Sequence, residues 1–573
     1  MRTPAPPAPR NRRFVAVLIL LTAIVVGSTW HTFSHTWDEP EHLAAGLSLL
    51  DRFRYEYDIQ HPPLGRVAIA IGPYLLGARS VGKPPPDGRP EGVEILYGEG
   101  RYWPFLTAAR AGVLPFLALA LWITFAWAWR AGFGERGALG AAAWLSLTPA
   151  MLGHAGIATL DVPAVATTLW AVYAIMDWLQ SPRRLGVLHM GIAVGVAVAT
   201  KLSAIPFLGL ALPACLVSAA LTTEGGLGLT RLGRRLLDLG AAALVAFAVV
   251  TLAYGGRWKY FTDSTHKFNQ ALYFLFGKTG RAHDLAYAFA AHVPLPESLQ
   301  LLLGGVQALE VHNQNGHLSY LLGETHGSGW WYFYLVALAV KTPLPLLVLG
   351  VTGLCLALRD GIRRQDPWRV LPLCLGAALL TFVSGFSRIN IGVRHVLILY
   401  PLLALGAGYC VVLAARRGRT ASGTAAARLG PLVAVGLLGA WQVLALARAY
   451  PDYLAYFNET VTNPERVVVD SDLDWGQDLR RLELALAERH VERLSFGYLG
   501  TADLAREPLP PTVLLAPGAR ATGWIAVSAL ARVYARGGYD WLDAQPKVAR
   551  IGKTIDLYYL AADAPPPSAA PGP

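Results

Sequence analysis

The sequence has few charged residues and few cysteines, and each shortage excludes a class of protein. Only 15% of its 573 residues are charged, whereas 54% are hydrophobic, and this balance lies outside the range of an ordinary soluble enzyme or a disordered chain. All four cysteines fall inside apolar runs, so no disulfide framework or CxxC metal site can organise the polar segments. The composition therefore indicates a membrane protein.

Basic residues outnumber acidic ones, with 49 Lys and Arg against 38 Asp and Glu and a net charge of +11. In a soluble chain this excess would suggest a nucleic acid as partner. Here many arginines stand in short turns between apolar stretches, where positive charge marks the cytoplasmic side of a membrane. We therefore expect a lipid bilayer, and no nucleic acid, as the partner of these charges.

About eleven apolar stretches are long enough, alone or with their flanks, to cross a bilayer, which takes about 20 residues. The pair on either side of Lys201 could also be one broken helix, and one further stretch is short. The stretches centre on residues 14–30, 104–129, 137–153, 162–179, 186–200, 203–221, 236–254, 331–358, 370–387, 392–414 and 430–447.

Arginine placement predicts the orientation of these stretches. If every stretch crosses, the N-terminus and five arginine-containing turns share one side, which the positive-inside rule makes cytoplasmic. The C-terminus and the long segments 31–103 and 255–330 then lie outside. No small-x-small cleavage site follows Trp30, so we expect the first stretch to remain as an uncleaved anchor.

The chain divides into four predicted parts. Residues 1–13 form a basic, proline-rich cytoplasmic tail, 14–447 a membrane domain, 448–560 an outer α/β domain and 561–573 a disordered tail. In the outer domain, RVVVD, RLSFGYL, GWIAVSAL and TIDLYYL predict strands, and QDLRRLELALAERH predicts a helix. In the outer loops, PEHLAAGLSLLDRF and PESLQLLLGGVQALEV predict amphipathic helices along the membrane surface.

Three carboxylates at the outer membrane face are candidates for chemistry, because ionisable residues there are costly. Asp38 and Glu39 follow the first apolar stretch, and Asp161 stands at the outer start of another. The alternative for Asp38 is a capping box with Glu41, and for Asp161 a simple helix N-cap. A capping box would leave Glu39 without a role, so we favour a catalytic role for the pair.

Cations on the outer side are the second group of candidates, because the orientation rule depletes them there. Lys201 lies in ATKLSA, Lys341 in LAVKTPLP, and Arg388, Arg394 and His395 lie in SRINIGVRH. Snorkelling toward the interface is the alternative for each. Clustered opposite carboxylates, these cations instead predict a site that binds a phosphate and activates a nucleophile.

A short proline-containing element adds His61, in YDIQHPPL, although by itself this element reads as a turn. Taken in order, the acidic pair, HPPL, the Asp before the fourth stretch, ATKLSA, GWWYFYLVALAVKTPLP and RHVLILYPLLAL resemble the C-type (GT-C fold) membrane glycosyltransferases. The most similar families are the protein O-mannosyltransferases and the bacterial aminoarabinose transferases, over about residues 10–415. The segment 255–330 is too short for the β-trefoil domain of eukaryotic protein mannosyltransferases, so a protein acceptor is not implied.

The resemblance implies a fold, a reaction and a location. The fold is an α-helical polytopic membrane protein of about eleven spans, with a small C-terminal α/β domain. The reaction is an inverting, one-step transfer of a sugar from a polyprenyl-phosphate donor to a hydroxyl of an unknown lipid, glycan or protein acceptor. The location is a bacterial plasma membrane, with the active site facing outside.

The resemblance also assigns roles to the candidates. Asp38 is the general base, while Glu39 and Asp161 position the acceptor or hold a divalent cation, the one cofactor considered. Lys201 and Arg394, with His395 as a further candidate, stabilise the departing phosphate. The full substrate-binding set is His61, Lys201, Lys341, Arg388, Arg394 and His395.

Two other functions compete with glycosyl transfer. A transporter or flippase of lipid-linked saccharides also needs outer cations and an apolar groove, but the paired repeats and midplane charges that favour alternating access are not evident. A membrane metalloprotease is disfavoured because the sequence contains no HExxH. The acidic run Asp470 to Asp478, beyond the family resemblance, could bind a sugar or a cation or be a solvated turn.

Overall fold

The computed structural model describes residues 9–223, 232–260, 275–277, 279–420 and 424–561. Residues 1–8 of the predicted N-terminal tail and 562–573 of the predicted C-terminal tail lie outside the described residues.

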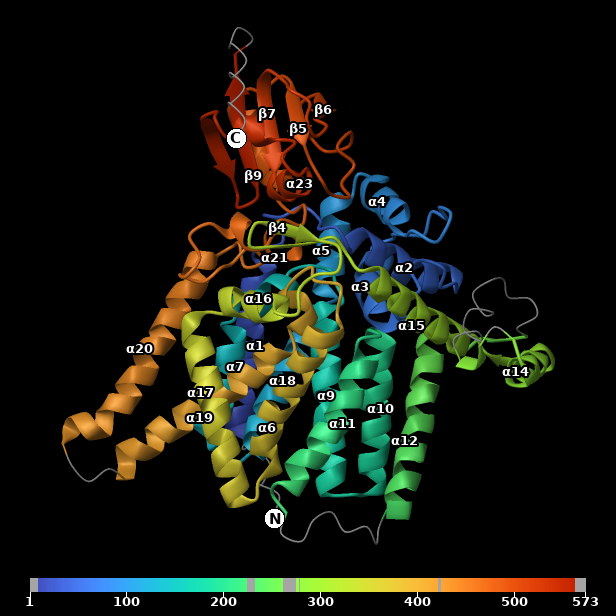
Figure 1. Cartoon of the computed structure of the whole chain (residues 1–573), viewed down its shortest axis with the longest axis vertical. Coiled ribbons are helices and arrows are strands. Elements are labelled where there is room, and N and C mark those ends of the chain that lie inside the picture. Colours follow the sequence, from blue (N-terminus) through green and yellow to red (C-terminus); the bar gives the residue numbers. More distant parts are fainter. Residues whose placement is uncertain (1–8, 224–231, 261–274, 278, 421–423, 562–573) are drawn as a thin grey trace.

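A bundle of long helices makes up the membrane part of the chain (Figure 1). Each apolar stretch predicted from the sequence contains a helix, which confirms an α-helical membrane protein. The helices are α1 (Pro9–Gly27), α5 (Tyr102–Ala111), α6 (Leu114–Arg130), α7 (Gly134–Ser146), α9 (Asp161–Gln180), α10 (Arg184–Thr200), α11 (Ala204–Ala220), α12 (Leu232–Ala253), α16 (Phe333–Lys341), α17 (Leu344–Arg364), α18 (Pro367–Phe386), α19 (Leu399–Thr420) and α20 (Ala425–Ala449).

The predicted count of eleven spans is not confirmed. In the described ranges, seven helices are long and apolar enough to cross a membrane by themselves. Helices α10 and α11 have 17 residues each and α7 has 13, below the length of about 20 residues that a span needs. Lys201 separates two distinct helices, since α10 packs on α12 and α11 packs on α18.

Helix α19 packs closely against helix α17. A Cβ atom added at Gly353 of α17 would overlap the carbonyl group of Gly406 in α19. Small residues at such crossings let two backbones approach closely, which is how membrane helices associate without a hydrophobic driving force. The start of α19 is thereby held firmly against the bundle.

Short helices and strands cover one end of the bundle, opposite the N-terminus (Figure 1). The two predicted amphipathic loop helices both form, as α2 and α15. The elements are α2 (Glu39–Arg52), α3 (Pro63–Leu75), α4 (Arg89–Tyr97), α8 (Pro149–Ala155), β1 (Trp258–Lys259), α14 (Arg281–His292), β2 (Leu295–Pro296), α15 (Glu297–Asn315), β3 (Ser319–Leu321), β4 (Glu324–His326) and η3 (Val393–Val396).

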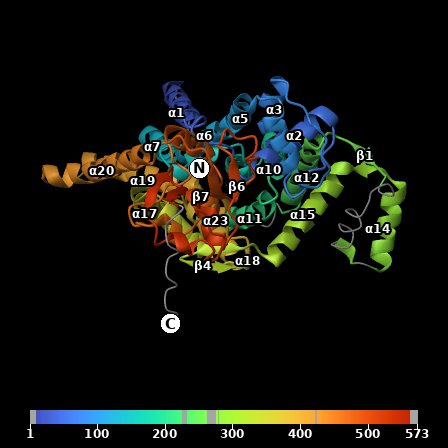
Figure 2. The same cartoon turned by 90° about the horizontal axis from the view of Figure 1, so that it is seen from above.

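A five-stranded sheet forms the C-terminal region, in the order β6-β5-β7-β9-β8. Strand β5 is parallel to β6 and β7, whereas β9 is antiparallel to β7 and β8. The sheet lies over the covered end of the bundle in both views (Figures 1 and 2). Its elements are α22 (Leu479–Glu488), β5 (Leu494–Gly497), β6 (Thr512–Leu514), β7 (Gly523–Ser528), α23 (Ala529–Tyr534), η5 (Asp540–Leu542), β8 (Lys547–Ile551) and β9 (Ile555–Leu560).

Three of the four predicted strands of this region form, as β5, β7 and β9, and the predicted helix forms as α22. The prediction of a strand in RVVVD is wrong. That run lies between η4 (Pro464–Arg466) and the short helix α21 (Asp470–Leu473), and Val468 and Val469 are buried. A run of β-branched residues can indicate a buried segment as well as a β-strand.

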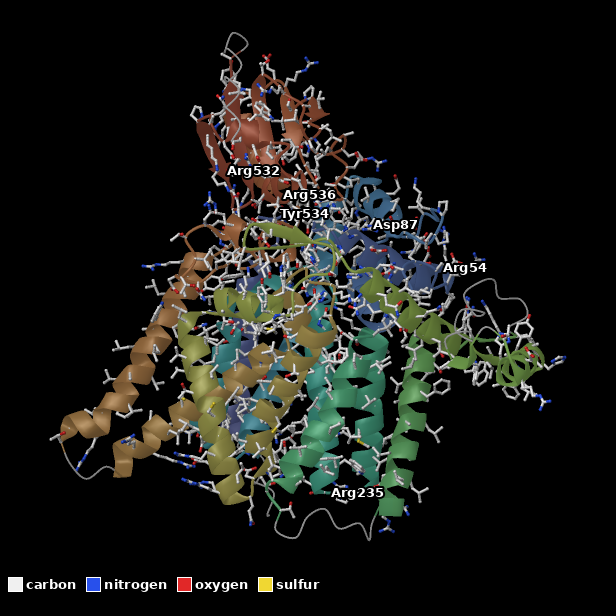
Figure 3. The ribbon with its side chains drawn as sticks, in the orientation of Figure 1. Arg54, Asp87, Arg235, Arg532, Tyr534 and Arg536 are labelled. Carbon is white, nitrogen blue, oxygen red and sulfur yellow. The ribbon has the colours of Figure 1, made fainter. Side chains whose placement is uncertain are left out.

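The two ends of the bundle differ in the residues that they carry. Figure 3 places Arg235 at the end of the bundle opposite Arg54 and Tyr534. Arg235 donates to the carbonyl groups of Trp178 and Leu179, at the end of the bundle where sequence analysis expects the cytoplasm. The side of the membrane that each end faces stays a prediction.

Candidate active site

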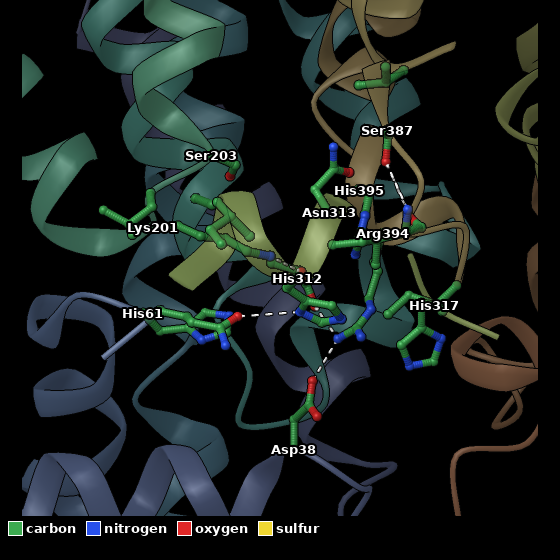
Figure 4. A pocket seen from close by; sticks show the side chains of 18 of the residues that line it. Asp38, His61, Lys201, Ser203, His312, Asn313, His317, Ser387, Arg394 and His395 are labelled. Atoms are coloured by element: carbon green, nitrogen blue, oxygen red, sulfur yellow. Dashed lines mark hydrogen bonds and ion pairs between the residues drawn. The ribbon is translucent and has the colours of Figure 1, made fainter. Parts of the chain in front are cut away.

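A cavity of about 800 Å³ lies where the bundle, the covering helices and the C-terminal region meet. Residues of α9, α11 and α18, among them Val165, Phe207 and Phe382, give it an apolar wall. Charged and polar side chains from the loops give it a second wall. Figure 4 shows Asp38 pointing toward Arg394, with Lys201 across the cavity from that arginine.

Asp38 stands directly before α2, but its side chain does not cap that helix. Its Oδ2 atom instead accepts a hydrogen bond from Nη1 of Arg394 at 2.6 Å. Arg394 lies in η3, and its guanidinium stacks on the Trp475 ring, 4.4 Å from the ring centroid. The backbone N–H of Val393, next to Arg394, donates to the carboxylate of Asp472. Residues far apart in the sequence thus hold this pair in place.

Asp161 is the first residue of α9 and is almost fully buried, yet it makes no helix-capping bond. Its Oδ1 atom accepts from Nζ of Lys201 at 2.7 Å, and its Oδ2 atom lies 3.9 Å from Nη1 of Arg394. Lys201 directly follows the last residue of α10. Arg394 therefore lies between two carboxylates, Asp38 and Asp161, and Lys201 completes the charge cluster.

Glu39 points away from the cavity, although it is next to Asp38 in the sequence. Its carboxylate is 1% exposed and accepts from Nε and Nη2 of Arg110 at 2.9 and 3.0 Å. The backbone N–H groups of Thr36 and Ala158 also donate to it, each at 2.7 Å. Burial alone would raise the pKa of Glu39, but Arg110 and these backbone donors outweigh it and lower the pKa. Glu39 does not line the cavity, so its predicted catalytic role is not supported.

His61 lines the cavity together with Asp58, a residue of the same motif that sequence analysis did not select. Nδ1 of His61 lies 2.7 Å from Oδ2 of Asp58, and Nη2 of buried Arg66 donates to the same oxygen at 2.5 Å. Burial would raise the pKa of Asp58, but His61 and Arg66 hold it well below its usual range. Glu41, also in the cavity, has a raised pKa because of burial and the nearby Asp58 charge.

The three remaining predicted cations lie in different surroundings. His395 lines the cavity, with Nδ1 3.2 Å from the Tyr334 hydroxyl. Lys341 is 1% exposed and donates to the carbonyl groups of Leu454 and Asp472, so it joins the end of α16 to the C-terminal region. Arg388 donates to the Gln314 carbonyl. Neither Lys341 nor Arg388 lines the cavity, because each is turned toward backbone carbonyl groups instead.

The predicted cation ligands do not fit a divalent ion. Asp38 and Asp161 both face the Arg394 guanidinium, and Glu39 faces Arg110. Across the described ranges, no group of three or more His, Cys, Asp or Glu side chains has a metal-holding arrangement. An arginine between two carboxylates occupies the place that a hard cation would need.

Several cavity residues were not selected by the sequence analysis. Asp58 and Gln60 belong to the motif YDIQHPPL, from which only His61 was selected, and Asp470 belongs to the acidic run for which a sugar, a cation or a solvated turn was considered. Tyr534 lies in no motif. The additional polar residues lining the cavity include Trp37, Glu41, Asp58, Gln60, Arg89, Glu310, His312, Asn313, His317, Asp470, Trp475 and Tyr534.

Comparison with known families bears on the same region. Residues 55–261 match the family model of dolichyl-phosphate-mannose-protein mannosyltransferase. Over this segment the chain carries a protein mannosyltransferase-type region. The predicted resemblance is therefore confirmed there. The matched segment contains His61, Asp161 and Lys201, while Asp38 and Arg394 lie outside it.

Solved structures give looser likenesses. ArnT from Cupriavidus metallidurans bound to undecaprenyl phosphate is 15% identical, with 95% of this chain and 97% of that chain covered and a TM-score of 0.46. The archaeal oligosaccharyltransferase AglB from Archaeoglobus fulgidus is 14% identical, covering 77% and 56%, with a TM-score of 0.44. The Pmt1-Pmt2 complex of S. cerevisiae is 18% identical, covering 43% and 34%, with a TM-score of 0.32. No curated protein matches the chain.

Proposed function

We propose that this protein is an inverting glycosyltransferase that moves a sugar from a polyprenyl-phosphate donor to a hydroxyl acceptor at the outer face of a plasma membrane. The observation that carries the proposal is one cavity in which a carboxylate, Asp38, and two cations, Arg394 and Lys201, meet an apolar wall of bundle helices. The match of residues 55–261 to the mannosyltransferase family supports it.

The two walls fit the two parts of a lipid-phosphate donor. An isoprenoid tail needs an apolar surface that is continuous with lipid, and Val165, Phe207 and Phe382 offer one. A phosphate needs charge-assisted donors, which Arg394 and Lys201 supply. Nε of Arg394 is buried and has no hydrogen-bond partner among the described residues, so the guanidinium keeps a donor for a phosphate oxygen.

Donor binding and base activation are linked through Arg394. Without a ligand, Oδ2 of Asp38 accepts a hydrogen bond from Nη1 of Arg394 at 2.6 Å, so this oxygen is engaged by the guanidinium. A donor phosphate competes for the same guanidinium and thereby releases Asp38 toward the acceptor. The resulting order is donor before acceptor.

The transfer itself is a single displacement. Asp38 takes the proton of the acceptor hydroxyl as that oxygen bonds to the anomeric carbon, while the bond between this carbon and the phosphate oxygen breaks. Positive charge builds on the sugar in an oxocarbenium-like transition state, and negative charge builds on the phosphate. Arg394 and Lys201 stabilise the phosphate charge. One displacement inverts the anomeric centre.

A release assay tests the proposal. Purified protein in sealed proteoliposomes receives radiolabelled polyprenyl-phosphate mannose, glucose or arabinose, together with a cell lipid extract as the acceptor source. Transfer predicts free polyprenyl phosphate and a labelled product from wild type, and neither from Asp38→Asn. Asp284→Asn is the matched control, because this aspartate is 75% exposed on α14, away from the cavity. If the sugar crosses the membrane with its phosphate bond intact, the protein is a flippase instead.

A further inference from the structure

The C-terminal region contributes a carboxylate to the cavity, and this carboxylate differs from the others. Asp38 and Asp161 face Arg394, and Asp58 faces Arg66. Asp470 also lines the cavity, yet in the described part of the chain no Lys, Arg or His nitrogen lies within 4.0 Å of its oxygens. Burial raises the pKa of Asp470, with the more distant Arg394 acting in the opposite direction. Asp470 is half-buried, and a carboxylate removed from water without a paired cation is costly to maintain.

The backbone at Asp470 is strained in a way that the surroundings enforce. Its φ angle is +37°, in the left-handed region that non-glycine residues seldom adopt. The next residues are anchored, since Ser471 donates to the Ile391 carbonyl and Asp472 accepts from Val393. Such strain is unfavourable and tends to occur at functional sites. The chain therefore maintains an unfavourable conformation that keeps this carboxylate at the cavity.

The partners of Asp470 leave it able to accept more hydrogen bonds. Its Oδ1 atom accepts from the backbone N–H of Ser471 at 2.6 Å, and its Oδ2 atom lies 3.2 Å from the Tyr534 hydroxyl. That hydroxyl has one proton and also lies 3.0 Å from the Leu318 carbonyl, so it cannot donate to both. An ionised carboxylate has about four acceptor positions. Figure 3 places Tyr534 at the base of the C-terminal sheet, where it faces the bundle.

The neighbours of Asp470 indicate the kind of ligand. Tyr534 and His317 both line the cavity, and they offer a hydroxyl group and an imidazole ring beside the carboxylate. A carboxylate beside a hydroxyl group and an imidazole ring suits hydrogen-bond donors such as the hydroxyl groups of a sugar ring. An anionic ligand group would instead be repelled there and directed to Arg394 and Lys201.

We propose that Asp470, supported by Tyr534 and flanked by His317, accepts hydrogen bonds from the hydroxyl groups of a sugar and so helps to select the substrate. This role rests on the proposed glycosyl transfer. The sugar belongs either to the donor or to a glycan acceptor, and the chemistry is the same for both. The C-terminal region is then the part of the active site that binds the sugar, whereas the bundle helices contact the lipid and Arg394 and Lys201 bind the phosphate.

A comparison of sugar-bearing and bare ligands tests this role. Polyprenyl phosphate and polyprenyl-phosphate mannose compete for wild type, Asp470→Asn and the control Asp540→Asn, an exposed aspartate of the same region that does not line the cavity. If the donor sugar contacts Asp470, the variant binds the bare phosphate as wild type does but the mannose donor about tenfold more weakly, the scale of one hydrogen bond to a charged group. If the acceptor contacts it, both affinities stay and the acceptor KM rises about tenfold instead.

Two further outcomes decide against the inference. Unchanged donor affinity and unchanged acceptor KM in Asp470→Asn, with an active wild type, would mean that Asp470 contacts no sugar. Equal weakening of the bare and the sugar-bearing ligand would make it a structural support of Arg394. Tyr534→Phe removes the supporting hydroxyl group and keeps the ring. It should therefore weaken binding of the mannose donor relative to the bare phosphate, or raise the acceptor KM, as Asp470→Asn does. This variant replaces Asp470→Asn in the test if Asp470→Asn does not fold. A wild type that releases no polyprenyl phosphate from any donor would refute the proposed function itself.

Discussion

Two arginine–carboxylate clusters lie side by side at the start of α2, and they differ in how completely their hydrogen bonds are used. In the sealed pair, Arg110 and Glu39, the arginine donates to the carboxylate and to the carbonyl groups of Trp30, Phe33 and Ser34. In the cavity pair, Arg394 and Asp38, Nε of the arginine has no partner among the described residues. The sealed pair leaves nothing to offer a ligand, whereas the cavity pair does.

The sealed pair contributes to the stability of the fold, whereas the cavity pair is available for chemistry. A buried ion pair whose donors are all used connects segments, here α2, α5 and the loop before α9. A pair with unused donors beside a cavity is available for binding, and its members exchange partners when a ligand arrives. Asp38 and Glu39 therefore have different roles although they are consecutive in the sequence. Substitution of Asp38 should change turnover, and substitution of Glu39 should change stability.

The largest effect is expected from breaking the sealed pair. Arg110→Ala leaves the Glu39 carboxylate buried and unpaired, which costs about 3–5 kcal/mol. Thermal unfolding in detergent should show a large loss of stability, and expression should fall. The control Arg54→Ala removes an exposed arginine whose ion pair with Glu56 lies at the surface and should change stability little. A variant with wild-type stability would mean that Glu39 is not sealed by Arg110.

The next effect is on activity alone. Asp38→Asn keeps the size of the side chain but removes the basic oxygen, so turnover should fall about a hundredfold or more while the unfolding temperature stays near that of wild type. Glu39→Gln should show the reverse pattern, with a greater loss of stability than of turnover. Turnover per folded molecule in the release assay separates the two. Full activity of Asp38→Asn would remove Asp38 from the mechanism.

A smaller effect is expected when the charge of Arg394 is kept but its shape is changed. Arg394→Lys loses the planar fork that matches a phosphate, so inhibition by free polyprenyl phosphate should weaken about tenfold, the loss of one charge-assisted hydrogen bond. Acceptor KM should change little. Lys201→Ala should act in the same direction. Unchanged inhibition in both variants would show that these cations face lipid headgroups or water.

Sequence analysis predicted most of the charged residues at the cavity, but it did not show which of the candidates face the cavity and which face away from it. Apolar length and arginine placement predicted the helices, and the short motifs selected Asp38, Asp161, Lys201, Arg394, His395 and His61, all of which line the cavity. The direction of a side chain is set by tertiary packing. For this reason the sequence did not distinguish Glu39 from its neighbour Asp38, nor show that Lys341 faces backbone carbonyl groups.

The parts that were missed depend on contacts between distant segments. Asp470 and Tyr534 reach the cavity only because the C-terminal sheet lies over the bundle (Figure 2), and no local pattern encodes that placement. Arg66 reads as one residue of an apolar helix until its contact with Asp58 is known. The number of spans does not follow from the sequence for a similar reason. Helices of 13 to 17 residues are shorter than a full span, so their position in the bilayer depends on the helices packed around them.

The smallest effect concerns a carboxylate that has backbone donors but, within the described ranges, no ion pair with a cation. Asp474 accepts from the backbone N–H groups of Leu530 and Gly476, and burial raises its pKa to about 6. Glu39 is the opposite case, since Arg110 lowers its pKa. A raised pKa means that the folded protein binds a proton more tightly than the unfolded chain does. The stabilisation from Asp474 is therefore present at low pH and is lost as the pH rises through about 4 to 6.

Asp474→Asn removes this titration, so the unfolding temperature of the variant should fall less than that of wild type between pH 4 and pH 7. In a chain of 573 residues, a difference of about 1 °C in that fall corresponds to about 1 kcal/mol. The change with pH is the quantity to compare, because the amide also turns one nitrogen toward a backbone N–H and lowers stability at every pH. Asp540→Asn, at an exposed aspartate, should keep the wild-type profile. Parallel profiles for wild type and Asp474→Asn would show that Asp474 stays ionised in the folded protein, so that its backbone donors and Ser528 would stabilise the charge as fully as Arg110 does for Glu39.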